Sequence, residues 1–391
     1  MTSKFNEVVI IAAARTPIGT YKGSLKQIKA DQLGSIVIKE VINRSRIDKS
    51  AIDEVIMGQV LTAGTGQNPA RQAAVNAGLS KSITAHIVNQ VCGSGLRSVI
   101  SGFQTIKLNE ANYVICGGQE NMSLAPLALL DENEKKLSKN KLTDTMIYDG
   151  LIDAFNNYHM GVTAENIADK FKISRQEQDE FALESQIKTQ LSLKQKRFND
   201  ELIKIKLGNY SLNKDEHPRD KLKIEDLKKL KPAFKKNGTV TAGNSSGIND
   251  GAAALVLSSL DEVKKKSLKP IAKIISWSSV GVEPSLMGLG PIGAVKSALK
   301  KANWKIDDVD LFEINEAFAA QSIAVIKELC IDKKKVNVNG GAIALGHPIG
   351  ASGTRILVTL IYEMLRQNKS KGCATLCIGG GMGIAICVEK F

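Results

Sequence analysis

Three side chains stand in sequence settings that favour chemistry: Cys92, His347 and Cys377. Cys92 occupies the segment NQVCGSGLR, where a turn of small residues runs into a helical pattern. A thiol at a helix N-terminus meets unpaired N–H groups and the positive end of the helix dipole. Such settings lower a thiol pKa from about 8.5 toward roughly 3.5–7.5. The sequence therefore predicts a nucleophilic thiolate at Cys92, against the alternative of a small buried hydrophobe.

His347 and Cys377 stand in glycine-rich segments of the C-terminal part. The segment NVNGGAIALGHPIGASG (337–353) contains so much glycine that it predicts a long shaped loop rather than a regular element. A histidine in that loop would act as a general base if Cys92 lies near it. Cys377 begins CIGGGMG, and because a strand follows rather than a helix, neither a P-loop nor a dinucleotide fingerprint fits. We expect a tight turn whose exposed N–H groups could hold an oxyanion.

An internal duplication would bring these segments together. The stretch 47–60 resembles 304–318, each with a short acidic lead-in before an apolar strand, and 94–106 resembles 352–364, each a Ser-Gly-x-Arg opening an amphipathic helix. After each helix comes a strand that ends in glycines. One α/β unit has therefore been duplicated, and the alternation of strands and helices predicts a layered α/β fold. Packed halves would place the two helix starts symmetrically about one site.

The two copies differ by a long insertion in the first. In the second copy the glycine turn leads straight into a closing strand, whereas the comparable strand of the first copy follows only after residues 122–248. We therefore expect an N-terminal half at 1–121, completed by 249–269, and a C-terminal half at 270–391. The inserted loop domain at 122–248 would carry ligand contacts, because insertions on a rigid scaffold often hold ligands.

Composition narrows the classes of protein. The chain has 391 residues, 43% of them hydrophobic, and no apolar run long enough to span a membrane. No signal or transit peptide precedes the first strand, so a cytoplasmic location is expected. The net charge of +13 suits nucleic acid or a small polyanion. Basic residues crowd 194–236 without a nucleic-acid-binding motif, so no nucleic-acid partner is expected.

Six cysteines match no zinc-binding spacing, so no metal site is expected. A chain of this size needs no disulfides, and free thiols are predicted. Four cysteines stand in apolar strands or helices and are predicted to be small buried residues: Cys116, Cys330, Cys373 and Cys387.

The blocks NQVCGSGLR, NEAF, GHPIGASG and CIGGGMG, in this order, resemble the signature blocks of the thiolase family, and the likeness spans the chain from AARTPIG onward. The resemblance implies a duplicated five-layered α/β/α/β/α fold with an inserted loop domain. It implies that Cys92 takes the acyl group, that His347 activates it, and that Cys377 moves a proton at a second acetyl group. Asn315 of NEAF matches the residue that holds a water in one oxyanion hole, and the backbone at Cys92 and Gly379 matches another.

Coenzyme A thioesters are the substrates that this resemblance implies, with no permanently bound cofactor. Lysines of the basic insertion would raise the local concentration of such a polyanion. The positions expected to hold the coenzyme or the acyl group are His159, Met160, Arg219, Ala233, Phe234, Ser246, Met287, Ala317 and Phe318.

The pair His159-Met160 resembles short-chain members of the family, and Met160 and Met287 would fill space that a longer acyl chain requires. The expected reaction is the reversible condensation of two acetyl-CoA to acetoacetyl-CoA and CoA. The alternatives are a broad-range 3-ketoacyl-CoA thiolase, a ketoacyl synthase, and a non-catalytic CoA- or lipid-binding relative. The segment 119–141 resembles the loop that ties dimers into tetramers, so a homotetramer built as a dimer of dimers is expected.

Overall fold

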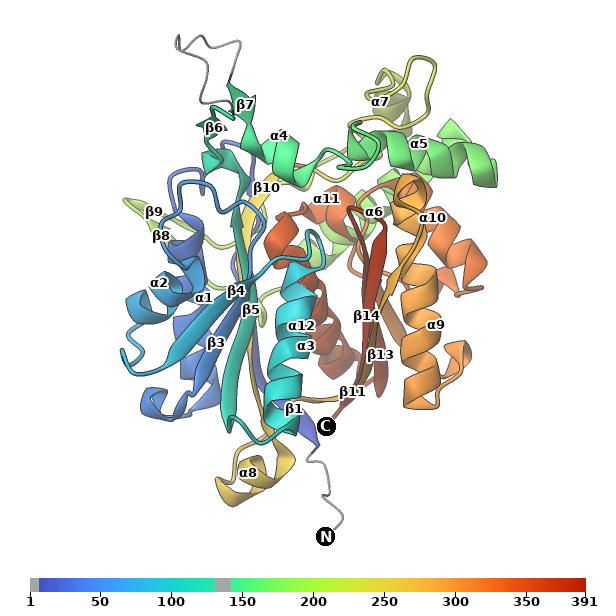
Figure 1. The fold of residues 1–391 in the computed structure, drawn as a ribbon. Helices are drawn as coiled ribbons and strands as arrows, with labels where there is room; N and C mark the ends of the chain where they lie inside the picture. Colours follow the sequence, from blue (N-terminus) through green and yellow to red (C-terminus); the bar gives the residue numbers. More distant parts are fainter. Residues whose placement is uncertain (1–6, 131–141) are drawn as a thin grey trace.

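The computed structural model describes residues 7–130 and 142–391. Its main sheet consists of two halves joined edge to edge, in the order β12-β13-β14-β11-β1-β10-β5-β3-β4, with β2 paired to β10 (Figure 1). The first half contains β1 (Val8–Arg15), β2 (Gly19–Thr20), β3 (Glu54–Gly58), β4 (Thr84–Val88), β5 (Tyr113–Asn121) and β10 (Asn249–Ser259). The second half contains β11 (Ala272–Gly281), β12 (Leu311–Ile314), β13 (Lys371–Ile378) and β14 (Met382–Lys390).

The strand pairing confirms the duplication. In the first half β3 lies parallel to β5, and β5, β10 and β1 then pair antiparallel. In the second half β12 lies parallel to β13, and β13, β14 and β11 pair antiparallel in the same way. A short pairing of β1 with β11, Val9 with Lys273 and Ile10 with Ala272, joins the two halves into one sheet. That edge contact has no counterpart in the sequence pattern.

Five layers follow from how the helices cover the two half-sheets (Figure 1). Alternate residues of β1 face opposite sides: Val8 and Ile10 belong to the core between the half-sheets, and Val9 and Ile11 to the outer core. The helices between the half-sheets are α3 (Ser94–Lys107) and α12 (Ile349–Gln367). The outer faces are covered by α1 (Ala30–Ser45) and α2 (Pro69–Asn76) on one side, and by α9 (Gly290–Ala302) and α10 (Ala319–Glu328) on the other.

Two glycines let the central helices cross closely at their N-terminal ends. A Cβ on Gly353 of α12 would lie 2.3 Å from the amide nitrogen of Leu96, and one on Gly95 of α3 would lie 2.7 Å from that of Thr354. Thr354 Oγ1 also donates to the carbonyl of Gly95 at 2.8 Å. These are the glycines of the two repeated Ser-Gly openings, so the repeat itself brings the helix starts together.

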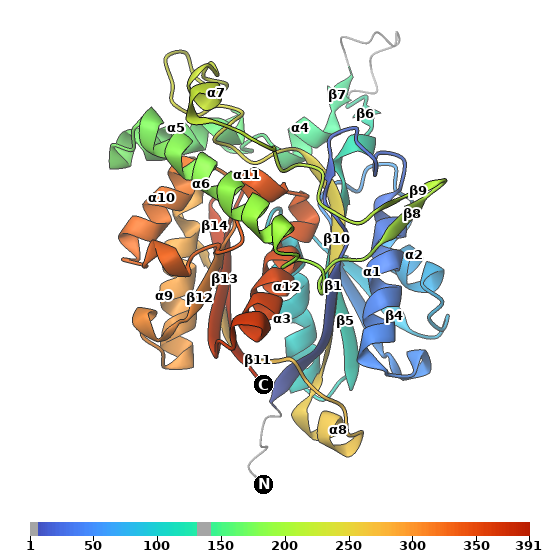
Figure 2. The same cartoon turned by 180° about the vertical axis from the view of Figure 1, so that it is seen from behind.

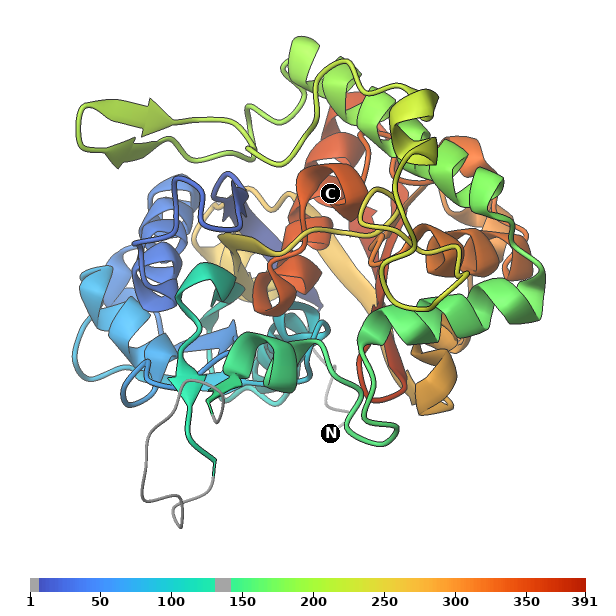
Figure 3. The same ribbon diagram turned by 90° about the horizontal axis from the view of Figure 1, so that it is seen from above.

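The insertion passes over one end of both half-sheets, as the views from behind and from above show (Figures 2 and 3). Strands β5 and β10 pair with each other although the insertion separates them in the chain. Its elements are β6 (Leu127–Ala128), β7 (Thr143–Asp144), α4 (Thr145–Gly150), α5 (Met160–Phe171), α6 (Arg175–Lys194), β8 (Ile205–Leu207), β9 (Tyr210–Leu212) and α7 (Ile224–Lys228). The exact limits of 122–248 stay a prediction.

The segment 337–353 is more regular than the sequence suggested. A short helix, α11 (Ala342–Leu345), forms within it, and α12 begins at Ile349, before the Ser-Gly opening. The prediction of an irregular loop was therefore wrong in part, because the glycine-free stretch AIAL is long enough for one helical turn. Helix α8 (Leu260–Lys265) lies at the far end of the molecule (Figure 1). Among the described residues, no helix combines the length and apolarity needed to cross a membrane.

Candidate active site

A cavity of about 360 Å³ has walls from the central helix starts, the β13–β14 turn and the insertion. It brings together nearly all the residues singled out from the sequence: Cys92, His159, Met160, Arg219, Ala233, Phe234, Ser246, Met287, Ala317, Phe318, His347, Cys377 and Gly379. Asn315 is 1% exposed and lies behind this wall, with its Nδ2 3.4 Å from Nε2 of His347. Residues scattered from position 92 to position 379 thus form one site.

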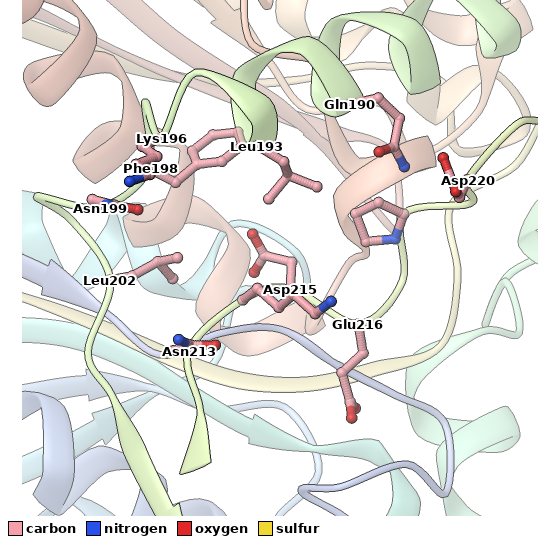
Figure 4. A pocket seen from close by; sticks show the side chains of 12 residues that line it. Gln190, Leu193, Lys196, Phe198, Asn199, Leu202, Asn213, Asp215, Glu216 and Asp220 are labelled. Atoms are coloured by element: carbon pink, nitrogen blue, oxygen red, sulfur yellow. The ribbon is translucent and has the colours of Figure 1, made fainter.

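A larger cavity of about 550 Å³ contains none of the predicted site residues (Figure 4). It lies between the end of α6 and the segment 213–220. The carboxylate of Asp215 in its wall already accepts bonds from Arg15 at 2.7 and 3.0 Å and from the amide of Ile18 at 2.8 Å. Because this buried charge is satisfied within the protein, we place the chemistry in the smaller cavity.

Cys92 lies in the turn before α3, as predicted, but its thiol is not the expected thiolate. Burial raises the pKa of the Cys92 thiol to about 11, and the nearby carboxylate of Glu120 adds to the rise. Backbone N–H groups of Gly379 and of Cys92 itself donate toward the sulfur and oppose the shift without reversing it. The prediction of a lowered pKa was wrong, because removal from water outweighs the helix-terminus effect. A base must therefore remove the proton.

Gly93 explains how the two cysteines approach each other. A Cβ at position 93 would lie 2.4 Å from the side chain of Ile378, the neighbour of Cys377. Cys377 is the last residue but one of β13 and is 1% exposed, and the turn to β14 runs through Gly380 and Gly381, both with positive φ. The predicted tight turn is therefore present. Burial raises the pKa of the Cys377 thiol, and its closeness to the Cys92 sulfur raises that pKa further.

His347 is held as a neutral imidazole. Burial lowers the pKa of His347 to about 3, and the positive charge of Arg355 acts in the same direction. Its Nδ1 lies 2.5 Å from Ser352 Oγ, which donates its single hydroxyl proton to the carbonyl of Pro348 at 2.9 Å. Nδ1 must then carry the ring proton, and Nε2 keeps its lone pair. The backbone amide of His347 donates to Asn249 Oδ1 at 2.8 Å, and this hydrogen bond fixes the backbone from which the ring extends.

A neutral thiol beside a neutral imidazole defines the chemistry available here. The thiol becomes a nucleophile only as its proton leaves, and an imidazole with a free nitrogen can take that proton. The buried setting also strengthens any donor aimed at a developing negative charge, such as the Gly379 N–H. Covalent acyl transfer is the reaction class that this arrangement fits.

One end of the cavity is apolar. Met160, Met287, Phe318 and Cys377 belong to one buried cluster. The ring of His159 stacks on Phe234 with 4.6 Å between centroids, and its Nδ1 accepts the amide N–H of residue 161 at 3.0 Å. Burial lowers the pKa of His159, which favours a neutral ring. A short apolar group would fill this end.

Sequence reasoning missed several residues of the cavity wall. They are Met122, Gly150, Leu151, His217, Ala242, Ser245, Gly247, Ile248 and Ile349. The most informative is His217, whose pKa is lowered to about 4 by burial and by Arg219. A Cβ on Gly247 would lie 2.3 Å from its ring. The signal was available, because His217 and Arg219 share the DEHPRD segment.

The remaining cysteines divide into two groups. Cys116, Cys373 and Cys387 are fully buried, as predicted. Cys330 is exposed, so the prediction of burial was wrong for this residue. It lies in the left-handed turn after α10, with a φ of 53°, and its neighbours Leu329 and Ile331 pack into the core instead.

Comparison with known proteins finds thiolase relatives that match nearly the whole length of the chain. Models of the thiolase N-terminal and C-terminal domains match residues 8–261 and 268–390. An acetyl-CoA acetyltransferase of Paracoccus denitrificans is 53% identical, with 98% of this chain and 99% of the relative covered. One of Syntrophomonas wolfei is also 53% identical, with 98% and 99% covered.

Solved structures agree as closely. The acetyl-CoA acetyltransferase of Bacillus anthracis superposes with a TM-score of 0.96 at 42% identity, over 99% of both chains. Human mitochondrial 3-ketoacyl-CoA thiolase in complex with CoA gives 0.95 at 41% identity, over 99% of this chain and 98% of that one. The duplicated five-layered fold, the domain matches and the full-length identities establish that this chain belongs to the thiolase family.

Proposed function

We propose that the protein is an acetyl-CoA C-acetyltransferase, which reversibly condenses two acetyl-CoA molecules to acetoacetyl-CoA and CoA. The observation that carries the proposal is a single cavity in which Cys92, His347 and Cys377 meet next to a short apolar end. The full-length relatives described as acetyl-CoA acetyltransferases support the same activity.

The first step transfers an acetyl group to Cys92. Its sulfur attacks the thioester carbonyl of acetyl-CoA while Nε2 of His347 takes the thiol proton. The new sulfur–carbon bond forms, the bond to the CoA sulfur breaks, and the departing thiolate recovers the proton from the imidazolium. The N–H groups of Cys92 and Gly379 already converge on the sulfur, so they are placed to stabilise the oxyanion that develops beside it.

The second step forms the carbon–carbon bond. Nε2 of His347 takes the proton of the Cys377 thiol, and the resulting thiolate removes a proton from the methyl carbon of a second acetyl-CoA, which restores the Cys377 thiol. The carbanion attacks the acetyl carbonyl on Cys92. The bond to the Cys92 sulfur breaks, and that thiolate takes the proton from the His347 imidazolium to restore the resting thiol. Nδ2 of Asn315 lies 3.4 Å from Nε2 of His347, and the N–H groups of Asn315 and of the protonated His347 would stabilise the enolate oxygen of the second acetyl-CoA.

Coenzyme A is the proposed partner, as free CoA and as its acetyl and acetoacetyl thioesters. Arg219, Ala233, Phe234 and Ser246 line the cavity and would contact its arm or its phosphates. The exposed lysines 228, 231 and 236, on either side of Ala233 and Phe234, carry no ion pair within the part of the chain that the structure describes. Their charge would attract a polyanionic substrate.

Chain length separates the proposal from its nearest alternative, a broad-range 3-ketoacyl-CoA thiolase. The fold alone does not separate the two, because both an acetyl-CoA acetyltransferase and human mitochondrial 3-ketoacyl-CoA thiolase superpose on this chain. Met160 and Met287, 7% and 4% exposed, favour a short acyl group because they occupy the apolar end. The test is thiolysis of acetoacetyl-CoA by free CoA beside 3-ketohexanoyl-CoA and 3-ketodecanoyl-CoA. Equal kcat/KM for all three would replace the proposal by the broad-range enzyme.

A homotetramer, built as a dimer of dimers, is also proposed. Large apolar side chains are exposed on and around β6 and α4, where a second copy would cover them: Leu124, Leu127, Leu129, Leu130, Ile147 and Tyr148. Part of the segment 119–141 lies outside the described residues. Light scattering after size-exclusion chromatography should give the mass of four chains, and Leu127→Glu with Leu130→Glu should leave dimers. A dimeric wild-type protein would refute the tetramer.

A further inference from the structure

The site rests on a buried arginine that has few hydrogen bonds. Arg355 of α12 is 2% exposed. Its Nη1 lies 3.5 Å from the carboxylate of Glu313, and its Nη2 lies 3.5 Å from Oδ1 of Asn315. Its Nε and Nη1 have no hydrogen-bond partner within the described residues. A buried guanidinium with unused donors costs free energy, so the position calls for a reason other than stability.

The other fully buried arginine shows what a purely structural role looks like. Arg15 donates to Glu201 at 2.6 Å and to both oxygens of Asp215 at 2.7 and 3.0 Å, and none of these residues lines the cavity that contains Cys92. Arg355 instead contacts one carboxylate at long range and the amide of a residue that touches the general base. The contrast directs attention to Asn315.

Asn315 has an amide whose two ends differ in what they can do. Its Oδ1 accepts and its Nδ2 donates, and a rotation of 180° about χ2 exchanges them. The backbone N–H of Asn315 donates to the Thr375 carbonyl at 3.0 Å, but that hydrogen bond leaves χ2 of the side chain free. Arg355 presents a donor on the oxygen side, and His347 Nε2 presents a lone pair on the nitrogen side. The only donor of this amide is thus turned toward the imidazole and the cavity.

We propose that Arg355, paired with Glu313, is a positioning residue that fixes the amide orientation of Asn315 for the carbon–carbon bond-forming step. The inference rests on the proposed function, because it needs a step in which Asn315 faces an oxyanion. A flipped amide would aim an oxygen at that charge and would repel it. Acetyl transfer to Cys92 uses the N–H groups of Cys92 and Gly379 instead, so the loss of Arg355 should separate the two half-reactions.

The experiment measures both half-reactions in the intact enzyme. Acetylation of Cys92 is followed by quenched intact-protein mass spectrometry after mixing with acetyl-CoA, and the complete reaction by thiolysis of acetoacetyl-CoA. Arg355→Met and Arg355→Lys should slow complete turnover about 10- to 100-fold, since loss of a whole oxyanion donor costs roughly 10²–10³. In Arg355→Lys, which keeps the positive charge that acts on His347, acetylation should stay within about threefold of wild type. Arg355→Lys keeps a cation beside Glu313 and serves if the methionine variant does not fold.

Arg15→Lys is the matched control, because it alters a buried arginine that does not touch the site. Arg15→Lys should either leave the rates of both half-reactions unchanged or lower both rates by the same factor. A double-mutant cycle completes the test: in an Asn315→Ala background, Arg355→Lys should slow turnover by less than about threefold, because nothing remains to be oriented.

Two outcomes would overturn the role of Arg355, and a third would instead refute the proposed function. Equal slowing of acetylation and turnover in the Arg355 variants, or additive effects of Arg355→Lys and Asn315→Ala, would make Arg355 a structural residue only. A wild-type enzyme that neither acetylates Cys92 nor cleaves acetoacetyl-CoA would instead refute the proposed function, and this control is run first.

Discussion

Helices α3 and α12 lie side by side in the middle layer, and each begins soon after one of the side chains proposed to react. Before α3 stands Cys92, half-buried on the cavity wall; before α12 stands His347, 5% exposed. The two repeated arginines have also diverged. Arg97 of α3 is partly exposed and lies over the ring of Trp277 at 5.8 Å, whereas Arg355 of α12 is enclosed between Glu313 and Asn315. In the proposed mechanism, the same framework thus presents the nucleophile in one half and the base in the other.

The difference teaches that the two halves share one backbone framework, whereas the side chains at the two helix starts differ. The first half contributes to the second through Glu120 of β5, a buried carboxylate that accepts the amide N–H of Gly350 at 2.9 Å. It also accepts the amides of Val60 and Leu61 at 3.0 and 3.2 Å. Burial raises the pKa of Glu120 to about 7 despite these three donors. A residue of one half thereby ties down the helix start of the other.

The largest effect should come from removing the base of the second half. His347→Ala should lower kcat/KM for acetoacetyl-CoA thiolysis by about 10²–10⁴, the usual contribution of a general base. His159→Ala is the comparison, since it alters a second neutral cavity histidine that caps α5 and stacks on Phe234. It should cost about tenfold. Equal losses in the two variants would mean that His347 has no special role, and the contrast between the halves would fail.

The nucleophile of the first half should titrate late. Because burial raises the pKa of Cys92 to about 11, its thiolate fraction at pH 7 is lower by roughly two orders of magnitude than for a thiol of pKa about 8.5. In a Cys330→Ser protein, which lacks the exposed thiol, alkylation of Cys92 by iodoacetamide should rise about tenfold per pH unit from 7 to 10. Rates that level off below pH 8 would show a stabilised thiolate and restore the helix-terminus expectation.

The acyl end of the cavity should select short chains. One methylene of mismatch in an apolar pocket is worth about 1–3 kcal/mol, or roughly 10–200-fold in specificity. Wild type should therefore prefer acetoacetyl-CoA over 3-ketohexanoyl-CoA by at least about tenfold in kcat/KM. Met160→Ala should narrow this ratio, chiefly by improving the longer substrate. Loss of packing alone would lower kcat/KM for both substrates by the same factor. An unchanged ratio in the variant would therefore mean that Met160 does not set the chain-length preference.

The smallest effect should come from the insertion's charge. Replacing lysines 228, 231 and 236 with glutamine should raise the KM for CoA thioesters about two- to tenfold at low salt and leave kcat unchanged. The KM for acetoacetyl-pantetheine should not change, because that substrate has no phosphates. Glutamine at lysines 264, 265 and 266, at or beside α8 at the opposite end of the molecule, is the matched control. Equal changes in the two triple variants would reduce the effect to net charge.

Much of this site could be predicted because its residues sit in compact sequence blocks. Cys92, His347 and Cys377 each follow or begin a glycine-rich turn, and the repeated Ser-Gly openings indicated which segments would meet. The direction of the Cys92 pKa shift could not be predicted, because it depends on how much protein surrounds the sulfur rather than on its neighbours in the chain. The same holds for Arg355, whose partners lie about 40 residues away in sequence.

Several features of the fold could not be predicted from the sequence for a related reason. The pairing of β1 with β11 depends on two strand edges that meet only after both half-sheets have formed. Exposure of Cys330 depends on the left-handed turn that ends α10. His217 was visible in DEHPRD, but only the folded insertion places it against the same cavity as His347. Local pattern predicted the elements, whereas burial and strand-edge contacts required the assembled layers.

The most direct test of the division of labour is intact-protein mass spectrometry after a brief pulse of acetyl-CoA. Wild type should gain one acetyl group, Cys92→Ser should gain none, and Cys377→Ala should gain one yet fail to cleave acetoacetyl-CoA. That pattern would assign the covalent step to the first half and the proton transfer to the second. An acetyl group that persists on another residue of Cys92→Ser, or full turnover by Cys377→Ala, would contradict the account.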